Sequence, residues 1–397
     1  MSFYFLTFLL LAAGALLEWF RPQHEEKIYW VCWTTTTAVL CLRYGQGTDY
    51  VTYEAIYATI PTVIDLPQGY ICGFFPETGW RLISALFKVL HAPFWVFTMV
   101  LGLVNMLLLH RFLNKYVPMK VTGLFLSYPV LYVVYMVSGL RQGLLMCLFL
   151  GILIPFYLEK KWIFYIIGVL VAASFHKVGY TWLVLPAAYY IPVWGMAVLT
   201  GLAVLAGCII QIGAVEQFIV NLLPIYHVKS FLLENEISVF AVGERLISFG
   251  ILFFLYLWLK KKNASMDAKT ELFLKAYMCG VCFYMLMFGN AYYASRYAVI
   301  FKIVECAVLA ALIKEREMIQ KAAFGFFFAL TLVMGYKNLN AMIYEGGYSG
   351  MGIHVWDFPY VSVLNQDEIR KYRDYDRLLQ DKYDANIEDQ QLWMIEE

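Results

Sequence analysis

Apolar runs that are long enough to cross a lipid bilayer follow one another along most of this chain. They are separated by short stretches that carry charges and prolines. A helix needs roughly 20 apolar residues to cross a bilayer, so we expect an all-α polytopic integral membrane protein with about 12 transmembrane helices. The expected spans are 3–20, 28–42, 94–111, 121–138, 141–158, 162–175, 178–191, 193–212, 245–260, 270–289, 296–313 and 320–337.

The composition excludes a soluble protein of this length. Hydrophobic residues make up 61% of the 397 residues and charged residues only 15%, whereas soluble domains carry about 25% charged residues. Continuous apolar runs such as 152–156 and 326–334 lack the alternation of a membrane β-barrel. A net charge of +1 without a basic block argues against a nucleic-acid partner.

Lysines and arginines cluster in alternate loops, at 111–120, 160–161, 260–269 and 314–321. The positive-inside rule puts these loops in the cytoplasm and both termini outside. The main external loops are then 43–93, 213–244 and 338–365. Residues 77–91 are apolar on one side but carry Arg81 and Lys88, so we expect an amphipathic helix at the outer surface.

Polar residues near the expected external helix ends are the candidate functional groups. They are Arg43, Asp49, Glu77, Arg141, Gln142, His176, Lys177 and Arg296. Ionisable groups at membrane depth are costly, so their default interpretation is functional. Arg141 and Arg296 begin helices, where the helix dipole disfavours a cation but the backbone N–H groups favour a bound anion such as phosphate.

Each candidate also has a structural interpretation. Arg43 could extend its charge to the membrane interface, and His176 could be a packing residue instead of a proton-transfer group. Asp49 and Glu77 could simply pair with Arg43 or Arg81. These alternatives stay open at the level of sequence.

The sequence contains no recognisable metal-binding motif, and the first external loop has no adjacent acidic pair. The acidic pair of Asp374 and Asp376 lies in a charged C-terminal tail, 366–397, which we expect to be solvated and separate from the membrane domain, 1–365. We therefore expect no metal and no other cofactor.

Five short motifs resemble the EpsG-like family, which comprises Wzy-type polymerases of bacterial capsule, exopolysaccharide and O-antigen. They are Arg-x-x-x-Gly-Thr-Asp-Tyr-x-x-Tyr at 43–53, Glu-x-Gly at 77–79, Ser-Gly-Leu-Arg-Gln at 138–142, Ala-x-x-Phe-His-Lys at 172–177 and Ser-Arg-Tyr at 295–297. The resemblance extends to about residue 365. The sequence departs from the family at Val178, where a small or hydroxyl residue commonly follows the lysine, and in the tail.

The resemblance implies a GT-C-like, metal-independent membrane glycosyltransferase at the outer face of the bacterial plasma (inner) membrane. It would transfer a growing glycan from undecaprenyl pyrophosphate to another lipid-linked repeat unit. The groups expected to bind pyrophosphate and substrate are Arg43, Arg141, Gln142, Arg296, Lys177, Tyr50 and Tyr53. One of His176, Asp49 and Glu77 would take the proton from the acceptor hydroxyl.

The expected partners are the undecaprenyl-pyrophosphate-linked oligosaccharides and membrane lipid, with a flippase and a chain-length regulator of the same pathway. Three other functions remain as alternatives. They are an O-antigen ligase, a flippase or transporter of lipid-linked sugars, and a membrane acyltransferase that acts on glycans.

Overall fold

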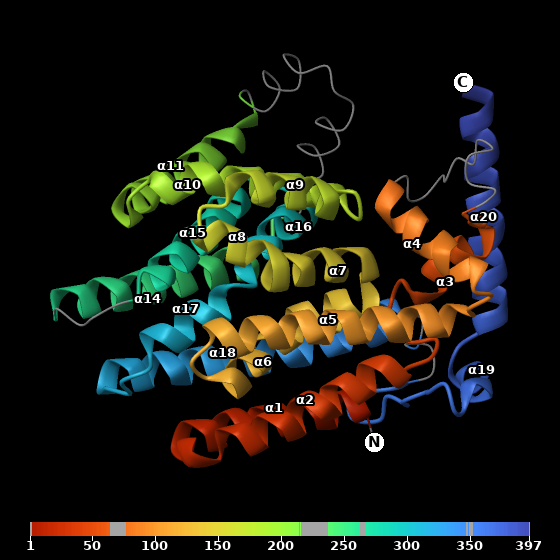
Figure 1. Cartoon of the computed structure of the whole chain (residues 1–397), viewed down its shortest axis with the longest axis horizontal. Helices are drawn as coiled ribbons and strands as arrows, with labels where there is room; N and C mark the ends of the chain where they lie inside the picture. Colours follow the sequence, from red (N-terminus) through yellow and green to blue (C-terminus); the bar gives the residue numbers. More distant parts are fainter. Residues whose placement is uncertain are drawn as a thin grey trace. The chain divides into compact units, whose positions relative to one another are not determined.

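The computed structural model describes residues 2–63, 77–213, 215, 237–262, 267–346, 348 and 352–396. Within these ranges the chain is helical and forms no strand (Figure 1). Eight helical segments are long and apolar enough to cross a membrane: Phe3–Phe20, Phe94–Tyr116, Lys120–Ser138, Leu140–Leu158, Val193–Ile210, Val239–Lys261, Ala268–Met287 and Met318–Glu345. The expected all-α polytopic membrane fold is confirmed.

The other four expected spans are also helical, but each is shorter or more polar than those eight. They are α2 (Glu25–Leu42), which begins with charged residues; α9 (Trp162–Ala173); the pair η5 (Lys177–Val184) and α10 (Leu185–Tyr190); and the pair α16 (Ala291–Lys302) and α17 (Glu305–Leu312). The number of crossings, about 12, therefore stays a prediction. Part of the expected external loop 43–93 and most of 213–244 lie outside the described residues.

The chain divides into two compact units. The first comprises Met1–Leu153, Ile167–Lys177 and Phe328–Glu397, and the second comprises Ile154–Ile166 and Val178–Phe327. Four of the five sequence motifs fall in the first unit, and the fifth, 295–297, falls in the second.

The first unit contains the helices that carry these four motifs. Its elements are α1 (Phe3–Phe20), η1 (Pro22–His24), α2, α3 (Tyr50–Thr59), α4 (Thr78–Val89), α5 (Phe94–Tyr116), α6 (Lys120–Ser127), the π-helical η3 (Tyr128–Ser138), α7 (Leu140–Leu148), the π-helical η4 (Phe149–Leu153), parts of α9 and α18 (Met318–Glu345), η7 (Gln366–Glu368), α19 (Ile369–Tyr372) and α20 (Tyr375–Glu396). Helix α1 packs against α2 and α6, and α2 packs against α5.

Buried polar contacts fix the position of α6 and η3. The carboxylate of Glu18 in α1 accepts hydrogen bonds from the backbone N–H groups of Val121 and Thr122, at 2.9 and 2.7 Å. These N–H groups have no partner within their own helix, so a buried carboxylate is well placed to cap them. The Tyr132 hydroxyl donates to the Thr36 carbonyl at 2.8 Å, which joins η3 to α2.

Helices α3 and α4 are short and lie outside the eight candidate spans. They pack on α5 through aromatic rings, with Tyr53 5.3 Å from Trp80 and Trp80 5.3 Å from Phe97 between ring centroids. Helix α4 leaves Leu82 and Leu86 exposed, an apolar surface suited to a membrane interface. The helix expected over 77–91 is therefore confirmed, and its place at the outer surface stays a prediction.

The second unit is arranged around α15 (Ala268–Met287), most of which is buried. Its other elements are α8 (Ile154–Leu158), part of α9, η5, α10, α11 (Val193–Ile210), α14 (Val239–Lys261), α16, α17 and part of α18. Helix α15 packs against α10, α11, α14, α16 and α17.

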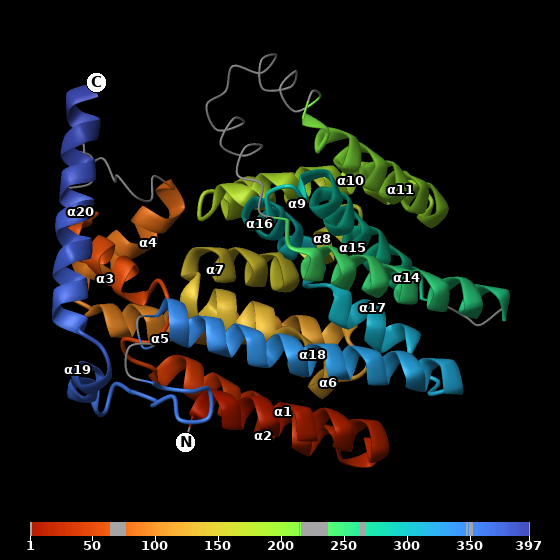
Figure 2. The ribbon, with the colours of Figure 1, turned by 180° about the vertical axis from the view of Figure 1, so that it is seen from behind.

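The charged tail is not detached from the membrane domain. Asp374 and Asp376 are exposed, as expected, but Ile369, Arg373 and Tyr375 are buried. Helix α20 packs along α3, and both views show the two helices side by side (Figures 1 and 2). The expectation of a solvated tail is therefore wrong for its inner face, because apolar and hydrogen-bonding residues alternate there with charged ones.

Candidate functional site

The loop that contains the 43–53 motif packs closely against the C-terminal end of η3. Gly47 has a φ of +122°, and a Cβ atom there would lie 2.6 Å from the carbonyl oxygen of Val137. The neighbouring N–H of Thr48 donates to Ser138 Oγ at 3.1 Å. Only glycine accepts both the backbone angle and the close approach. The 43–53 motif therefore lies directly on the 138–142 motif.

The 77–79 and 172–177 motifs also meet through a glycine. The N–H of Gly79 donates to the carbonyl oxygen of Ser174 at 2.8 Å, and a Cβ atom on Gly79 would lie 2.9 Å from that oxygen. This contact brings the start of α4 against the end of α9. Glu77 and His176 each stand two residues away from it.

An ion pair between Arg141 and Glu77 joins these two groups of motifs. Their side chains are only 11% and 8% exposed. Tyr53 in α3 is hydrogen-bonded to Arg141, and the charge of Asp49 acts on the same tyrosine. Burial raises the pKa of Tyr53, an effect that Arg141 opposes. Four motifs that are far apart in sequence thus converge within the first unit.

The position of Arg141 explains its need for an acidic partner. It is the second residue of α7, where the partial positive charge of the helix N-terminus repels a cation. Glu77 compensates this repulsion. A site that holds an arginine beside helix N–H groups is suited to an anion such as a phosphate group.

Arg43 is placed differently from the expectation. It is 1% exposed, and its guanidinium donates to the carbonyls of Leu40 at 2.6 Å and of Met136 and Val137 at 3.2 Å. The structure does not provide the expected phosphate contact, because carbonyls at the ends of α2 and η3 lack helical partners and bind the guanidinium. Arg43 instead holds two helix ends together.

The remaining candidates in this unit differ in their access to solvent. Tyr50 is fully buried with its ring 5.1 Å from that of Phe94, and Gln142 is buried as well, so neither offers a surface to a substrate in this structure. Asp49 and Lys177 are exposed and His176 is half-buried. The accessible candidates are therefore Asp49, His176 and Lys177.

These motifs lie inside a region that matches a known family. A family model described as the EpsG family matches residues 27–348. The chain belongs to the EpsG family. Membership indicates a membrane role of the polysaccharide-polymerase type. All five motifs lie inside the matched region, whereas the tail that contains α19 and α20 lies beyond it. Neither a curated protein nor a solved structure matches the chain.

Arg296, the remaining candidate of this EpsG-family chain, lies in the second unit. It lies inside α16, which begins at Ala291, so the expectation that Arg296 begins a helix is wrong. Its guanidinium carbon lies 4.0 Å from the centre of the Tyr292 ring. Stacking on an aromatic face stabilises the positive charge of the guanidinium. Its joint action with the residues of the first unit stays a prediction.

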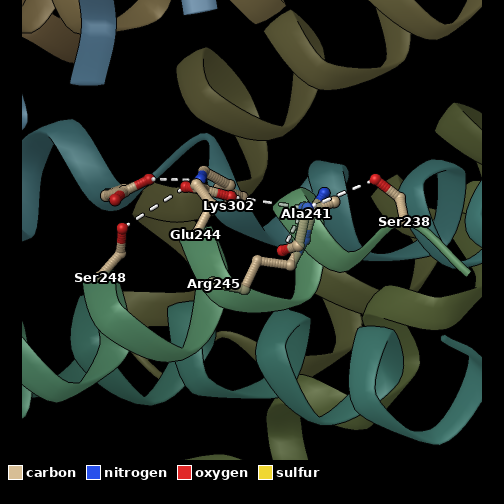
Figure 3. Close-up of polar contacts among 7 residues, drawn as sticks. Ser238, Ala241, Glu244, Arg245, Ser248 and Lys302 are labelled. Atoms are coloured by element: carbon tan, nitrogen blue, oxygen red, sulfur yellow. Dashed lines mark hydrogen bonds and ion pairs between the residues drawn. The ribbon is translucent and has the colours of Figure 1, made fainter.

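A buried charge cluster in the second unit was missed by the sequence reasoning. Glu244 lies between Lys302, with which it forms an ion pair, and Arg245 at 3.4 Å (Figure 3). Lys302 also contacts Glu305 at 3.4 Å, and the Arg245 guanidinium lies 3.8 Å from the centre of the Tyr284 ring. Two acidic and two basic side chains balance, so the cluster is neutral when all four are charged.

The sequence did contain a signal for this cluster. Lys302 and Glu305 stand three residues apart inside the expected span 296–313, and Glu244 precedes the span 245–260. Charges inside an apolar segment predict partners from other helices. Among the described residues, no group of three or more His, Cys, Asp or Glu side chains could hold a metal ion.

Proposed function

We propose that this EpsG-family protein polymerises lipid-linked repeat units. It transfers a growing glycan from undecaprenyl pyrophosphate to the next lipid-linked unit, at the outer face of the bacterial inner membrane. The observation that carries the proposal is the buried Glu77–Arg141 pair, at the point where four motifs converge. The family match indicates the class of reaction, and the arginine at a helix N-terminus suits a pyrophosphate leaving group.

The proposed reaction has two requirements. The acceptor hydroxyl oxygen attacks the anomeric carbon of the donor sugar and loses its proton to a base. The bond between that carbon and the pyrophosphate oxygen breaks, and undecaprenyl pyrophosphate leaves with the bonding electrons. Cationic N–H donors fixed near the leaving oxygen stabilise the charge that develops there. Arg141 supplies such donors, with Lys177 and Arg296 as further candidates.

Glu77 and Arg141 are proposed to change partners during this reaction. The pyrophosphate competes with the Glu77 carboxylate for Arg141, because a planar guanidinium binds either anion in a fork-like geometry. A carboxylate displaced from Arg141 could accept a proton. His176 and Asp49, which are more accessible, are the other candidate bases.

The proposed orientation follows from the loop charges. Lysines and arginines gather at the helix ends opposite to the four convergent motifs in the expected topology, and such loops stay in the cytoplasm. The proposed partners are therefore lipid-linked oligosaccharides and membrane lipid on the outer side, together with a flippase and a chain-length regulator.

A reconstituted assay tests the proposal. Purified protein in lipid vesicles is supplied with undecaprenyl-pyrophosphate-linked repeat units, and products are resolved by length. We expect a ladder of multiples of the repeat unit, which persists in excess EDTA because the donors that stabilise the leaving group are side chains. Activity lost in EDTA and restored by Mg²⁺ or Mn²⁺ would contradict the metal-free scheme.

The alternative functions give different products in the same vesicles. A ligase needs a lipid-core acceptor and attaches finished glycan once. A flippase moves lipid-linked sugar across the bilayer without extending it, and an acyltransferase leaves the number of repeat units unchanged. Absence of extension with any of these results would reject the polymerase.

The identity of the base is tested by three single substitutions, His176→Ala, Asp49→Asn and Glu77→Gln. Loss of the true base should slow turnover by roughly 10²–10⁴-fold, the range for positioned acid–base catalysis. The other two variants should retain most activity if they only bind or support the site. Measuring turnover at saturating substrate against pH distinguishes these cases, because only the base variant loses the acidic limb of the profile. Three nearly active variants would place the base elsewhere.

A further inference from the structure

The C-terminal tail contacts the 45–49 loop and helix α3, which adjoin the candidate site, through a small number of buried residues. The tail lies beyond the family match, which ends at residue 348. Its helix α20 follows α3 (Figure 2). The exposed ion pairs of the tail, such as Arg370 with Asp376 at 2.7 Å, are worth little because both groups stay in water. The buried contacts must therefore fix the tail to the site.

The first buried contact is made to the carbonyl of Gly45. Arg373, only 6% exposed, donates from Nη1 to this oxygen at 3.2 Å. The hydroxyl of Tyr348 donates to the same oxygen at 3.4 Å. Gly45 has a φ of +66°, and a Cβ atom there would lie 2.9 Å from Ile369. Contacts from the tail and from Tyr348 therefore hold the loop that precedes Asp49.

The second contact is made to α3 itself. The Tyr375 hydroxyl donates a hydrogen bond to the carboxylate of Glu54, and the Tyr375 ring lies 5.9 Å from that of Tyr44. Burial raises the pKa of Glu54, and the bond from Tyr375 opposes this shift. One turn and more along α3, Asn386 Nδ2 donates to Thr59 Oγ1 at 2.7 Å. The tail therefore holds α3 at its middle and at its C-terminal end.

Another side of α3 contacts the candidate catalytic residues. Tyr53, next to Glu54 in sequence, is hydrogen-bonded to Arg141, and Asp49 immediately precedes α3. A shift of α3 would therefore move Tyr53 and Asp49 relative to Arg141. A displacement of about 1 Å can cost on the order of 10²-fold in rate when reacting groups must be aligned.

We propose that Arg373 and Tyr375 are positioning residues, which hold the 45–49 loop and α3 so that Asp49 and Tyr53 keep their alignment with Arg141. This inference rests on the proposed polymerase function for its effect on turnover. The contacts that it invokes involve only the first unit and are independent of that function.

The test uses the full-length protein with single substitutions. Arg373→Ala removes one of the two donors to the Gly45 carbonyl. Tyr375→Phe removes only the hydroxyl that binds Glu54 and keeps the ring packing, so it serves as the test if Arg373→Ala folds poorly. We expect turnover at saturating lipid-linked substrate to fall roughly 10–100-fold in each. Arg373→Lys, which keeps a cationic donor, should recover part of the loss. Arg377→Ala is the matched control, because the side chain of Arg377, four residues further along the tail, is 77% exposed.

A second measurement separates positioning from general instability. Hydrogen–deuterium exchange of the backbone should rise in 44–59 for Arg373→Ala and remain unchanged in α1 and α2, while the thermal midpoint stays close to that of the unmodified protein. Unchanged exchange in 44–59 overturns the inference. Raised exchange with full turnover, or a general rise across the first unit, also overturns it.

The same pair of measurements distinguishes failure of this inference from failure of the proposed function. If the unmodified protein does not extend lipid-linked units, the polymerase assignment fails and the positioning of a polymerase site fails with it. The exchange difference between Arg373→Ala and Arg377→Ala then still decides whether the tail holds the loop.

Discussion

Replacing Arg141 by lysine is expected to reduce polymer formation by about 10²–10³-fold without loss of folded protein. Lysine keeps the positive charge that pairs with Glu77, so the buried carboxylate is still compensated. It cannot reproduce the planar fork of N–H donors that a guanidinium offers to phosphate oxygens. Removing one positioned donor from a developing oxyanion costs about this much in other enzymes. Product lengths in the reconstituted assay, together with the thermal midpoint, measure both effects.

Three further variants show whether the loss comes from the lost guanidinium or from the altered ion pair. Arg111→Lys is the matched control, because Arg111 is an exposed arginine near the C-terminal end of α5, in the same unit. Arg141→Ala with Glu77→Ala removes both charges, so it should fold better than Arg141→Ala alone and still be inactive. The exchanged pair, Arg141→Glu with Glu77→Arg, restores the ion pair but not the position of the guanidinium. Normal product lengths from Arg141→Lys would mean that the residue serves only the ion pair.

Replacing Lys302 by methionine is expected to lower the free energy of unfolding by about 3–5 kcal/mol, the usual cost of leaving a buried charge without its partner. Glu244, whose side chain is 2% exposed, and Glu305 both contact Lys302. Without the lysine, the cluster carries two negative charges and only Arg245 to balance them. Denaturant titration of the protein in detergent micelles would measure the change.

The controls for Lys302 separate burial from charge. Lys262→Met removes the partner of Glu317 in an exposed pair, whose side chains are 46% and 43% exposed, so we expect less than about 1 kcal/mol. Lys302→Met combined with Glu305→Leu restores neutrality and should recover part of the loss. Equal effects of Lys302→Met and Lys262→Met would show that the cluster adds nothing to stability.

The helical architecture could be predicted from the sequence, because the hydropathy of a segment depends only on the residues within it. Each expected span corresponds to a helical segment, and eight of these segments are both long and apolar enough to cross a membrane. The break between α16 and α17, inside the expected span 296–313, did not follow from hydropathy. The family was also accessible from sequence, since its motifs are short and local, and the match over 27–348 confirms it.

The pairing of the motifs depended on the tertiary structure. Arg141 and Glu77 are separated by 64 residues, and no local pattern favours this pair over Glu77 with Arg81, which the sequence also allowed. The partners of Arg43 also depended on the tertiary structure, because they are backbone carbonyls at helix ends. A carbonyl at a helix end is present in every sequence, so nothing in the residue types marks it as the partner.

The sequence by itself determined that the chain is a helical membrane protein of a recognisable family, because apolar run length and short motifs are properties of contiguous residues. Only the tertiary structure decided which charges face one another, that Arg43 is buried, and that Arg373 of the charged tail reaches Gly45, 328 residues away. The physical reason is that the energy of a buried polar group depends on its partner and its exclusion from water. Both are set by the packing of segments that are distant in the chain.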